Sequence, residues 1–191
     1  RQALSFVEHV ALEAAERHPV GEFDQAVGEL APRTLTVYVP IAAADGIDLP
    51  VLYMHDGQNL FDSQGSYSGE WGIDEAMDSL GLLAGECIVV AVDHGGMKRL
   101  NEYNPYDHVE YGKGEGDAYA DFIALTLKPW IDARYRTKKG RNCNFIAGSS
   151  MGGLISLYTL LKHPDVFGAA GVFSPAFWIG PGIYEEIARK K

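Results

Sequence analysis

The chain of 191 residues is long enough for one domain with a sizeable core and hardly long enough for two. Hydrophobic residues make up 47% and charged residues 22%, a composition that excludes disordered and low-complexity proteins. Lys and Arg number 16 against 26 Asp and Glu, and the net charge of −10 disfavours nucleic acids and anionic membrane surfaces as partners. Two cysteines, Cys87 and Cys143, are too few for a disulfide scaffold, so we expect buried free thiols.

Two stretches of about 20 residues carry no charge, residues 142–161 and 166–184. Asn, Ser and Gly interrupt the first, and Pro175 and Pro181 break the second, so we expect both in a folded interior rather than in a membrane. The chain starts at Arg1 without a basic-then-apolar leader, which suggests that any preceding segment has been removed. The compartment stays open, with the cytoplasm as first choice.

Residues 1–33 carry weak signals, and we predict a helix and loop extension there, ahead of a single domain over residues 34–191. From residue 34 onward, short apolar runs alternate with amphipathic stretches in a β-α-β rhythm. The predicted elements in chain order are strand Thr34–Val39, strand Leu49–His55, helix Gly72–Leu83, strand Cys87–Asp93, helix Asp117–Tyr135, strand Cys143–Ala147, helix Met151–Lys162, strand Ala169–Phe173 and helix Ile183–Lys190.

The central predicted strands are apolar on both faces, as a parallel sheet covered by helices on each side requires. We therefore expect an α/β fold with a mostly parallel sheet. Pro129 should kink or divide the long helix around it, because proline removes a helical N–H. Residues 95–116 are rich in glycine and polar residues and form a long connection after a strand, where binding loops are often found.

The sharpest chemical signal is the G-x-S-x-G run from Gly148 to Gly152, which directly follows a predicted strand and precedes a predicted helix. Glycines on both sides allow a sharp turn without Cβ clashes. The turn would expose the Ser150 Oγ at a helix N-terminus, where free N–H groups, that of Met151 among them, favour developing negative charge. We interpret Ser150 as a nucleophile; the alternative is a Gly- and Ser-rich helix start without chemistry.

A second signal lies where an apolar strand ends in His55, Asp56, Gly57 and Gln58. Loops at the carboxyl ends of parallel strands form the ligand crevice of open α/β sheets. A backbone N–H just past Gly57 is a candidate second oxyanion donor beside that of Met151. The alternative is a strand-ending turn in which His55 and Asp56 cap neighbouring backbone groups.

These signals and their surroundings occupy four segments: residues 53–62 (YMHDGQNLFD), 102–106 (EYNPY), 147–153 (AGSSMGG) and 173–178 (FSPAFW). In combination they resemble the putative esterase family of the α/β hydrolases, with its feruloyl and other carbohydrate esterases, enterochelin-type esterases and mycolyl transferases. The resemblance covers about residues 34–180. It implies an α/β-hydrolase sheet, a serine ester hydrolase with Ser150 as nucleophile, and an oxyanion hole made by the N–H groups of Gln58 and Met151. The substrate would be a small-molecule ester: a sugar ester, a siderophore ester or a short acyl ester.

The catalytic base is the point where the sequence departs from this family. In this fold the triad runs Ser, then Asp or Glu, then His along the chain, and no histidine follows His163. His163 lies about 13 residues beyond Ser150, roughly 20 Å along the intervening helix, which is too far for a base. We therefore expect the acid, the histidine and the C-terminal strands of the sheet to lie beyond Lys191. The alternatives are His55 or His94 as the base, or a non-catalytic binding module or an acyltransferase on the same fold.

Four residues are predicted to bind substrate: Asp56, Arg99, Glu102 and Trp178. Arg99 and Glu102 lie close together in the long connection, and we expect them to pair with each other and wall the pocket. The alternative is a solvated surface pair.

A metal centre is disfavoured. His55 and His94 each adjoin an aspartate at a strand end, but the H-E-x-x-H and H-x-x-E-H spacings are absent. Neighbouring side chains on a strand also point to opposite faces. We expect neither metal nor cofactor, and the sequence does not indicate an oligomeric state.

Overall fold

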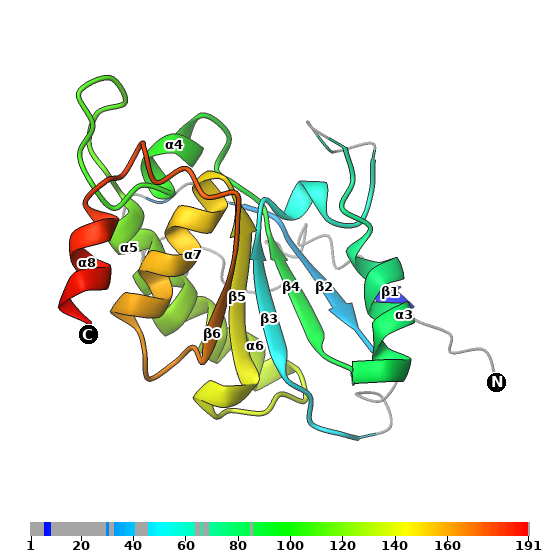
Figure 1. The fold of residues 1–191 in the computed structure, drawn as a ribbon. Coiled ribbons are helices and arrows are strands. Elements are labelled where there is room, and N and C mark those ends of the chain that lie inside the picture. The colour runs from blue at the N-terminus through cyan, green and yellow to red at the C-terminus, as the bar shows by residue number, and fades with distance from the viewer. Residues whose placement is uncertain are drawn as a thin grey trace.

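The computed structural model describes residues 6–8, 30, 33–40, 46–63, 66, 69–84 and 86–190. Six strands are present in these residues: β1 (Phe6–Glu8), β2 (Leu35–Val39), β3 (Val51–His55), β4 (Ile88–Val92), β5 (Asn144–Ser149) and β6 (Ala169–Phe173). They form one sheet in the order β1-β2-β4-β3-β5-β6 (Figure 1). The last four in this order run parallel, whereas β2 is antiparallel to both of its neighbours. The expected mostly parallel α/β sheet is confirmed.

Helices cover both faces of this sheet (Figure 1). The described α-helices are α3 (Ile73–Ala84), α4 (Arg99–Glu102), α5 (Gly116–Asp121), α6 (Lys128–Arg134), α7 (Met151–Lys162) and α8 (Ile183–Arg189). Shorter segments are the 3-10 turns η2 (Gly57–Asn59), η3 (Gly96–Lys98) and η5 (Arg141–Cys143) and the π-helical η4 (Phe122–Leu127). From residue 34 onward, every predicted element is confirmed to within two residues at each end.

Strand β4 shows why the central strands are apolar on both faces. All five of its residues are buried. Ile88, Val90 and Val92 belong to the larger core, which also contains apolar residues of α5, η4, α6, α7 and α8. Val89 and Ala91 point to the other side, into a smaller core that packs against side chains of α3. Because helices cover both faces, neither face of this strand can be polar.

The first strand replaces part of the helix that we expected near the N-terminus. Residues Phe6–Glu8 pair antiparallel with β2, with Val7 opposite Tyr38. The weak helical spacing there is overridden because the outer edge of β2 offers unpaired N–H and C=O groups. The rest of the predicted extension lies outside the described residues, apart from Leu30 and Arg33.

Pro129 acts as predicted on the long helix around it. Helical structure runs from Gly116 to Arg134, but the six residues Phe122–Leu127 just before the proline are π-helical. Proline has no N–H to donate and its ring crowds the carbonyl four residues earlier, so the backbone widens at this point. The helix begins at Gly116, and the Asp117 carboxylate in its first turn accepts a hydrogen bond from the Tyr158 hydroxyl (2.7 Å).

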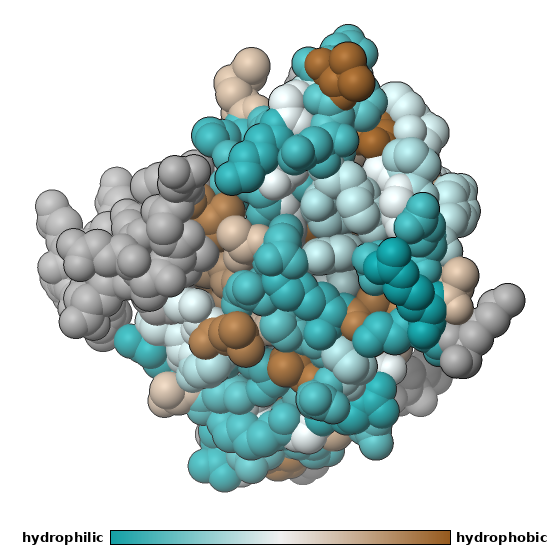
Figure 2. All heavy atoms as spheres, turned by 90° about the vertical axis from the view of Figure 1, so that its left-hand side faces the viewer, coloured by the Kyte–Doolittle hydropathy of each residue, from teal (hydrophilic) through white to brown (hydrophobic). Residues whose placement is uncertain are grey.

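The carboxyl ends of β3, β4, β5 and β6 meet at the edge of the sheet next to α4, at the top of Figure 1. Seen from the side of α8 and α5, the surface is mostly hydrophilic, with small and separate apolar patches (Figure 2). None of the described helices is long and apolar enough to cross a membrane. Cys87 and Cys143 are free, as expected, but only half-buried, and burial raises the pKa of the Cys87 thiol to about 11.

Candidate active site

Ser150 occupies a strained turn between β5 and α7. Its backbone has φ 57° and ψ −117°, a conformation that costs a residue other than glycine about 1–3 kcal/mol. Hydrogen bonds to the segment around the end of β6 hold it there: its N–H donates to the Phe173 carbonyl (3.0 Å), and its own carbonyl accepts from the Ala176 N–H (2.9 Å). The residue is exposed to solvent. The fold therefore stabilises a locally unfavourable turn that presents the Ser150 side chain at a helix N-terminus.

The first glycine of the G-x-S-x-G run makes this turn sterically possible. A Cβ added to Gly148 would lie 2.7 Å from the carbonyl carbon and oxygen of Gly152. Real Cβ atoms do not approach backbone atoms this closely, so the strand and the helix can meet only with glycine at position 148. The sequence predicted that glycine is needed here to avoid a Cβ clash. The clash would be with the backbone of Gly152, which comes close to Gly148.

The second predicted segment leaves the neighbouring strand. In the register of β3 and β5, Met54 lies opposite Ala147, so the turn after His55 and the Ser150 turn leave the same edge of the sheet. Asp56 has left-handed backbone angles, φ 58° and ψ 47°, and its carbonyl accepts a hydrogen bond from the Asn59 N–H (2.9 Å). The η2 turn follows directly.

Backbone N–H groups at the starts of η2 and α7 can donate to a ligand, because they lie in the first turn of each helix. Met151 is the first residue of α7, and such N–H groups have no acceptor within their own helix. Gln58 lies in the first turn of η2, where the same argument applies. A Cβ on the neighbouring Gly57 would lie 2.7 Å from Asp93 Oδ1 and 2.9 Å from the Ala91 carbonyl carbon, so η2 packs tightly on the end of β4.

The predicted pair of Arg99 and Glu102 is wrong. Arg99 instead binds Asp56 through two hydrogen bonds, from Nε to Oδ1 (2.6 Å) and from Nη2 to Oδ2 (2.8 Å). Glu102 accepts a hydrogen bond from Arg33 Nη2 (2.7 Å). The two residues lie at opposite ends of the single turn α4, and each finds a partner on another element.

Glu102 is also the most deeply buried of the four predicted substrate-binding residues. Its side chain is fully buried and that of Arg33 is 4% exposed, so in this structure Glu102 offers no surface to a ligand. The Arg33 guanidinium lies over the rings of Tyr119 and Phe122 at 5.1 and 5.4 Å. No motif in the sequence indicates a role for Arg33, which stands as a lone arginine just before an apolar strand.

His55 lies in the interior beneath the site. Its Nδ1 is hydrogen-bonded to the Tyr119 hydroxyl (3.0 Å), and its ring packs against those of Tyr103 and Tyr119 at 5.2 and 5.5 Å. Burial, opposed by the Asp56 charge and assisted by the nearby Arg99 and Arg33 charges, lowers the pKa of His55 to about 3. The imidazole is therefore neutral at physiological pH, and its hydrogen bond is to Tyr119 rather than to Ser150.

Two other histidines that the sequence analysis considered also have partners. His94 Nδ1 accepts a hydrogen bond from the Gly96 N–H (3.0 Å), and burial lowers its pKa. His163 is hydrogen-bonded to Asp121 (2.8 Å) at the far end of α7, as its distance along the chain indicated. Among the described residues, no histidine or carboxylate is hydrogen-bonded to the Ser150 hydroxyl. The expected positions of the catalytic acid and histidine lie outside the described residues.

Aromatic side chains lie beside both turns. Trp71 and Phe173 form an edge-to-face pair with ring centroids 5.6 Å apart. The Trp71 backbone N–H donates to the Asn59 carbonyl (2.9 Å), and the Phe173 carbonyl accepts from the Ser150 backbone N–H, so this pair adjoins both turns. Trp178, the predicted pocket residue, is 73% exposed. Trp130 is half-buried, packs against the larger core and lies beneath the Arg134 guanidinium.

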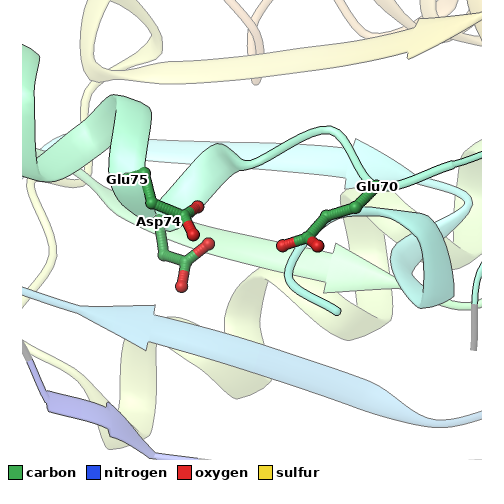
Figure 3. A group of neighbouring side chains, drawn as sticks. All are labelled: Glu70, Asp74 and Glu75. Carbon is green, nitrogen blue, oxygen red and sulfur yellow. The ribbon is translucent and has the colours of Figure 1, made fainter. Parts of the chain in front are cut away.

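Three carboxylates, those of Glu70, Asp74 and Glu75, gather at the start of α3 (Figure 3). One oxygen from each lies within 4.8 Å of the others. Burial, followed by a hydrogen bond with Glu75, raises the pKa of Asp74. Exposed acidic groups of this kind are common without an ion, and we assign no metal to them.

Comparison with known proteins identifies two proteins of similar sequence and a solved structure with the same fold. A Bacillus subtilis (strain 168) protein, "Uncharacterized protein YbbA", is 27% identical over 154 residues, which are 76% of this chain and 58% of that protein. The "Siderophore triacetylfusarinine C esterase" of Aspergillus fumigatus is 27% identical over 139 residues, 68% of this chain and 45% of that enzyme. The crystal structure of the BES protein from Bacillus cereus shares the fold with a TM-score of 0.69 and 20% identity, over 97% of this chain and 65% of that one.

The chain thus spans less than two thirds of the length of each of these three proteins. The family model described as "Putative esterase" matches residues 31–187, a range that includes β2 to β6, both turns of the candidate site and most of α8. The chain belongs to the putative esterase family.

Proposed function

We propose that this protein is a serine hydrolase that cleaves a carboxylic ester of a small molecule through an acyl-enzyme on Ser150. The observation that carries the proposal is the Ser150 turn: an exposed serine in a strained conformation at the start of the 12-residue helix α7. Strain of this kind persists only where the surrounding structure imposes it, and it is concentrated at functional sites. Membership of an esterase family supports ester cleavage as the reaction.

In the proposed reaction, Ser150 Oγ attacks the ester carbonyl and passes its proton to a general base. The carbonyl oxygen becomes an oxyanion, which accepts hydrogen bonds from the backbone N–H groups of Gln58 and Met151. The C–O bond to the alcohol then breaks, and the protonated base gives its proton to the leaving alcohol. Water cleaves the acyl-serine by the same steps and restores the free hydroxyl. The proposal assigns the base to a histidine outside the described residues.

For the substrate we propose a sugar ester, a siderophore ester or a short acyl ester. The name of the Aspergillus fumigatus relative supports the siderophore class. Asp56 and Trp178 lie on segments next to the Ser150 turn and remain candidate contacts for such a ligand. If an alcohol replaces water in the second step, the same acyl-enzyme gives an acyltransferase.

The test uses the protein at its natural length with a fluorophosphonate probe and short p-nitrophenyl esters. We expect labelling and turnover in the wild type, loss of both in Ser150→Ala, and most activity retained in the matched control Ser149→Ala. Labelling that persists in Ser150→Ala would reject the nucleophile. A protein that binds esters but never turns them over would instead be the binding module that the sequence left open.

A further inference from the structure

The Asp56 carboxylate lies between the two backbone segments that carry the proposed oxyanion donors. It belongs to the turn that leads into Gln58, and a Cβ added to Gly152 would lie 3.3 Å from its Oδ2. Gly152 is the second residue of α7 and follows Met151 directly. A displacement of this carboxylate would therefore disturb the Gln58 turn, the start of α7, or both.

Arg99 and Tyr103 together fix Asp56 through both its side chain and its backbone. The guanidinium of Arg99 holds the carboxylate with two parallel bonds of 2.6 and 2.8 Å. It also lies over the Tyr103 ring at 5.0 Å, and the Tyr103 hydroxyl accepts a hydrogen bond from the Asp56 N–H (3.2 Å). These contacts offset the cost of the left-handed backbone at Asp56.

The helical turn that carries Arg99 is itself held in place. Glu102, at the other end of α4, is bound to Arg33 at 2.7 Å, and both side chains are almost completely buried. Arg33 lies two residues before Leu35, the first residue of β2. The Arg99 backbone is thus connected by two ion pairs to the sheet on one side and to the Asp56 turn on the other.

We propose that Arg99 is a positioning residue for the esterase reaction: by holding the Asp56 carboxylate, it aligns the N–H groups of Gln58 and Met151 on the oxyanion. The inference rests on the proposed function and gives Arg99 no contact with the substrate. A bidentate guanidinium fixes both the position and the plane of a carboxylate, whereas an ammonium acts as a point charge. Alignment matters because oxyanion donors act only at hydrogen-bond distance from the developing charge.

The expected signature is a loss of kcat without a rise in KM, since the donors act in the transition state. Arg99→Ala should lower kcat by about 10²-fold, the cost typical of one lost oxyanion donor. Arg99→Lys keeps the charge but loses the bidentate geometry, so we expect a smaller loss of about 10-fold. Methylguanidinium ions should raise the kcat of Arg99→Ala and leave that of the wild type unchanged.

The experiment measures kcat and KM for these variants of the natural-length protein on p-nitrophenyl esters, with thermal unfolding of each variant to show that it is folded. The matched control is Arg136→Ala, which removes an exposed ion pair with Asp48 (3.1 Å) near the start of β3, at the opposite edge of the sheet. We expect its kcat and KM to equal those of the wild type. A double-mutant cycle with Gln58→Pro, which deletes one donor N–H, tests whether Arg99 acts through that group.

The outcomes separate this inference from the proposed function. If the wild type shows no Ser150-dependent turnover, the proposed function fails and the inference fails with it. If the wild type is active but Arg99→Ala raises KM at constant kcat, Arg99 binds substrate and the positioning role is wrong. A cycle in which the losses from Arg99→Ala and Gln58→Pro simply multiply would also overturn it, because residues that act through one donor must be non-additive.

Discussion

Acid should destabilise this protein through His55, and the effect can be isolated by substitution. The pKa of this buried imidazole is lowered to about 3, whereas in the unfolded chain it titrates near 6.5. Below pH 6.5 the unfolded state therefore binds a proton that the folded state does not bind. The stability that depends on neutral His55 is fully present above about pH 6.5 and falls as the pH drops towards 3. The slope is about 1.4 kcal/mol per pH unit, so about 2 kcal/mol is lost by pH 5.

His55→Asn removes the titration and places an amide close to the position of Nδ1, which is bonded to Tyr119 at 3.0 Å. The variant should be less stable than the wild type at pH 8, because the ring contacts with Tyr103 and Tyr119 are lost. That deficit should shrink by about 2 kcal/mol between pH 8 and pH 5, since only the wild type pays the cost of protonation. Carboxylates shared by both proteins cancel in the comparison.

The measurement is urea unfolding followed by tryptophan fluorescence at pH 5, 6, 7 and 8, analysed as the difference between the two proteins. His108→Asn, on the loop between α4 and α5, is the control and should keep the pH dependence of the wild type. A deficit for His55→Asn that stays constant from pH 8 to pH 5 would refute the reasoning, because it would mean that His55 titrates alike in both states.

Two further predictions concern the strained turn and the end of β4. Ser150→Gly should be more stable than Ser150→Ala by about 1 kcal/mol in urea unfolding, because glycine adopts positive φ without a Cβ clash; equal stabilities would mean that the turn is not strained. Burial, followed by the Asp56 charge, raises the pKa of half-buried Asp93 to about 6, so the folded state gains a proton before the unfolded state as the pH falls. Asp93→Asn should therefore raise the free energy of unfolding above that of the wild type by more at pH 8 than at pH 5. The difference between the two pH values should be about 1 kcal/mol after allowance for solvent screening. An equal effect at both pH values would show that Asp93 does not titrate between them.

The elements of this fold could be predicted because their signals are local. The G-x-S-x-G run fixes the meeting of β5 and α7 to within two residues, since a sharp turn demands glycine at position 148. Strand β4 is recognisable because all five of its residues must be apolar beneath helices on both faces. Strand β1 was missed because it gains its structure from pairing with β2, and three residues carry too little pattern of their own.

The ion pairs of the candidate site could not be predicted in the same way. Arg99 and Glu102 are three residues apart, a spacing that favours contact on a helix surface. Their true partners, Asp56 and Arg33, are 43 and 69 positions away in sequence and come into contact only when the chain folds. Spacing rules describe exposed helices, and α4 is a single turn whose Glu102 is fully buried.

One buried and one partly buried arginine–carboxylate pair lie at one edge of the sheet, and geometry explains them better than stability does. Removing charged groups from water costs several kcal/mol per ion, and apolar replacements of similar volume are often neutral or stabilising. What an apolar contact cannot supply is direction, since dispersion is nearly the same for many side-chain orientations. A bidentate pair such as that of Arg99 and Asp56 allows one arrangement, and it does so at a residue held in left-handed backbone geometry. The desolvation cost of the Arg99–Asp56 pair is therefore incurred next to Gln58 and Met151. These are the residues whose backbone N–H groups the proposed chemistry needs in a fixed direction.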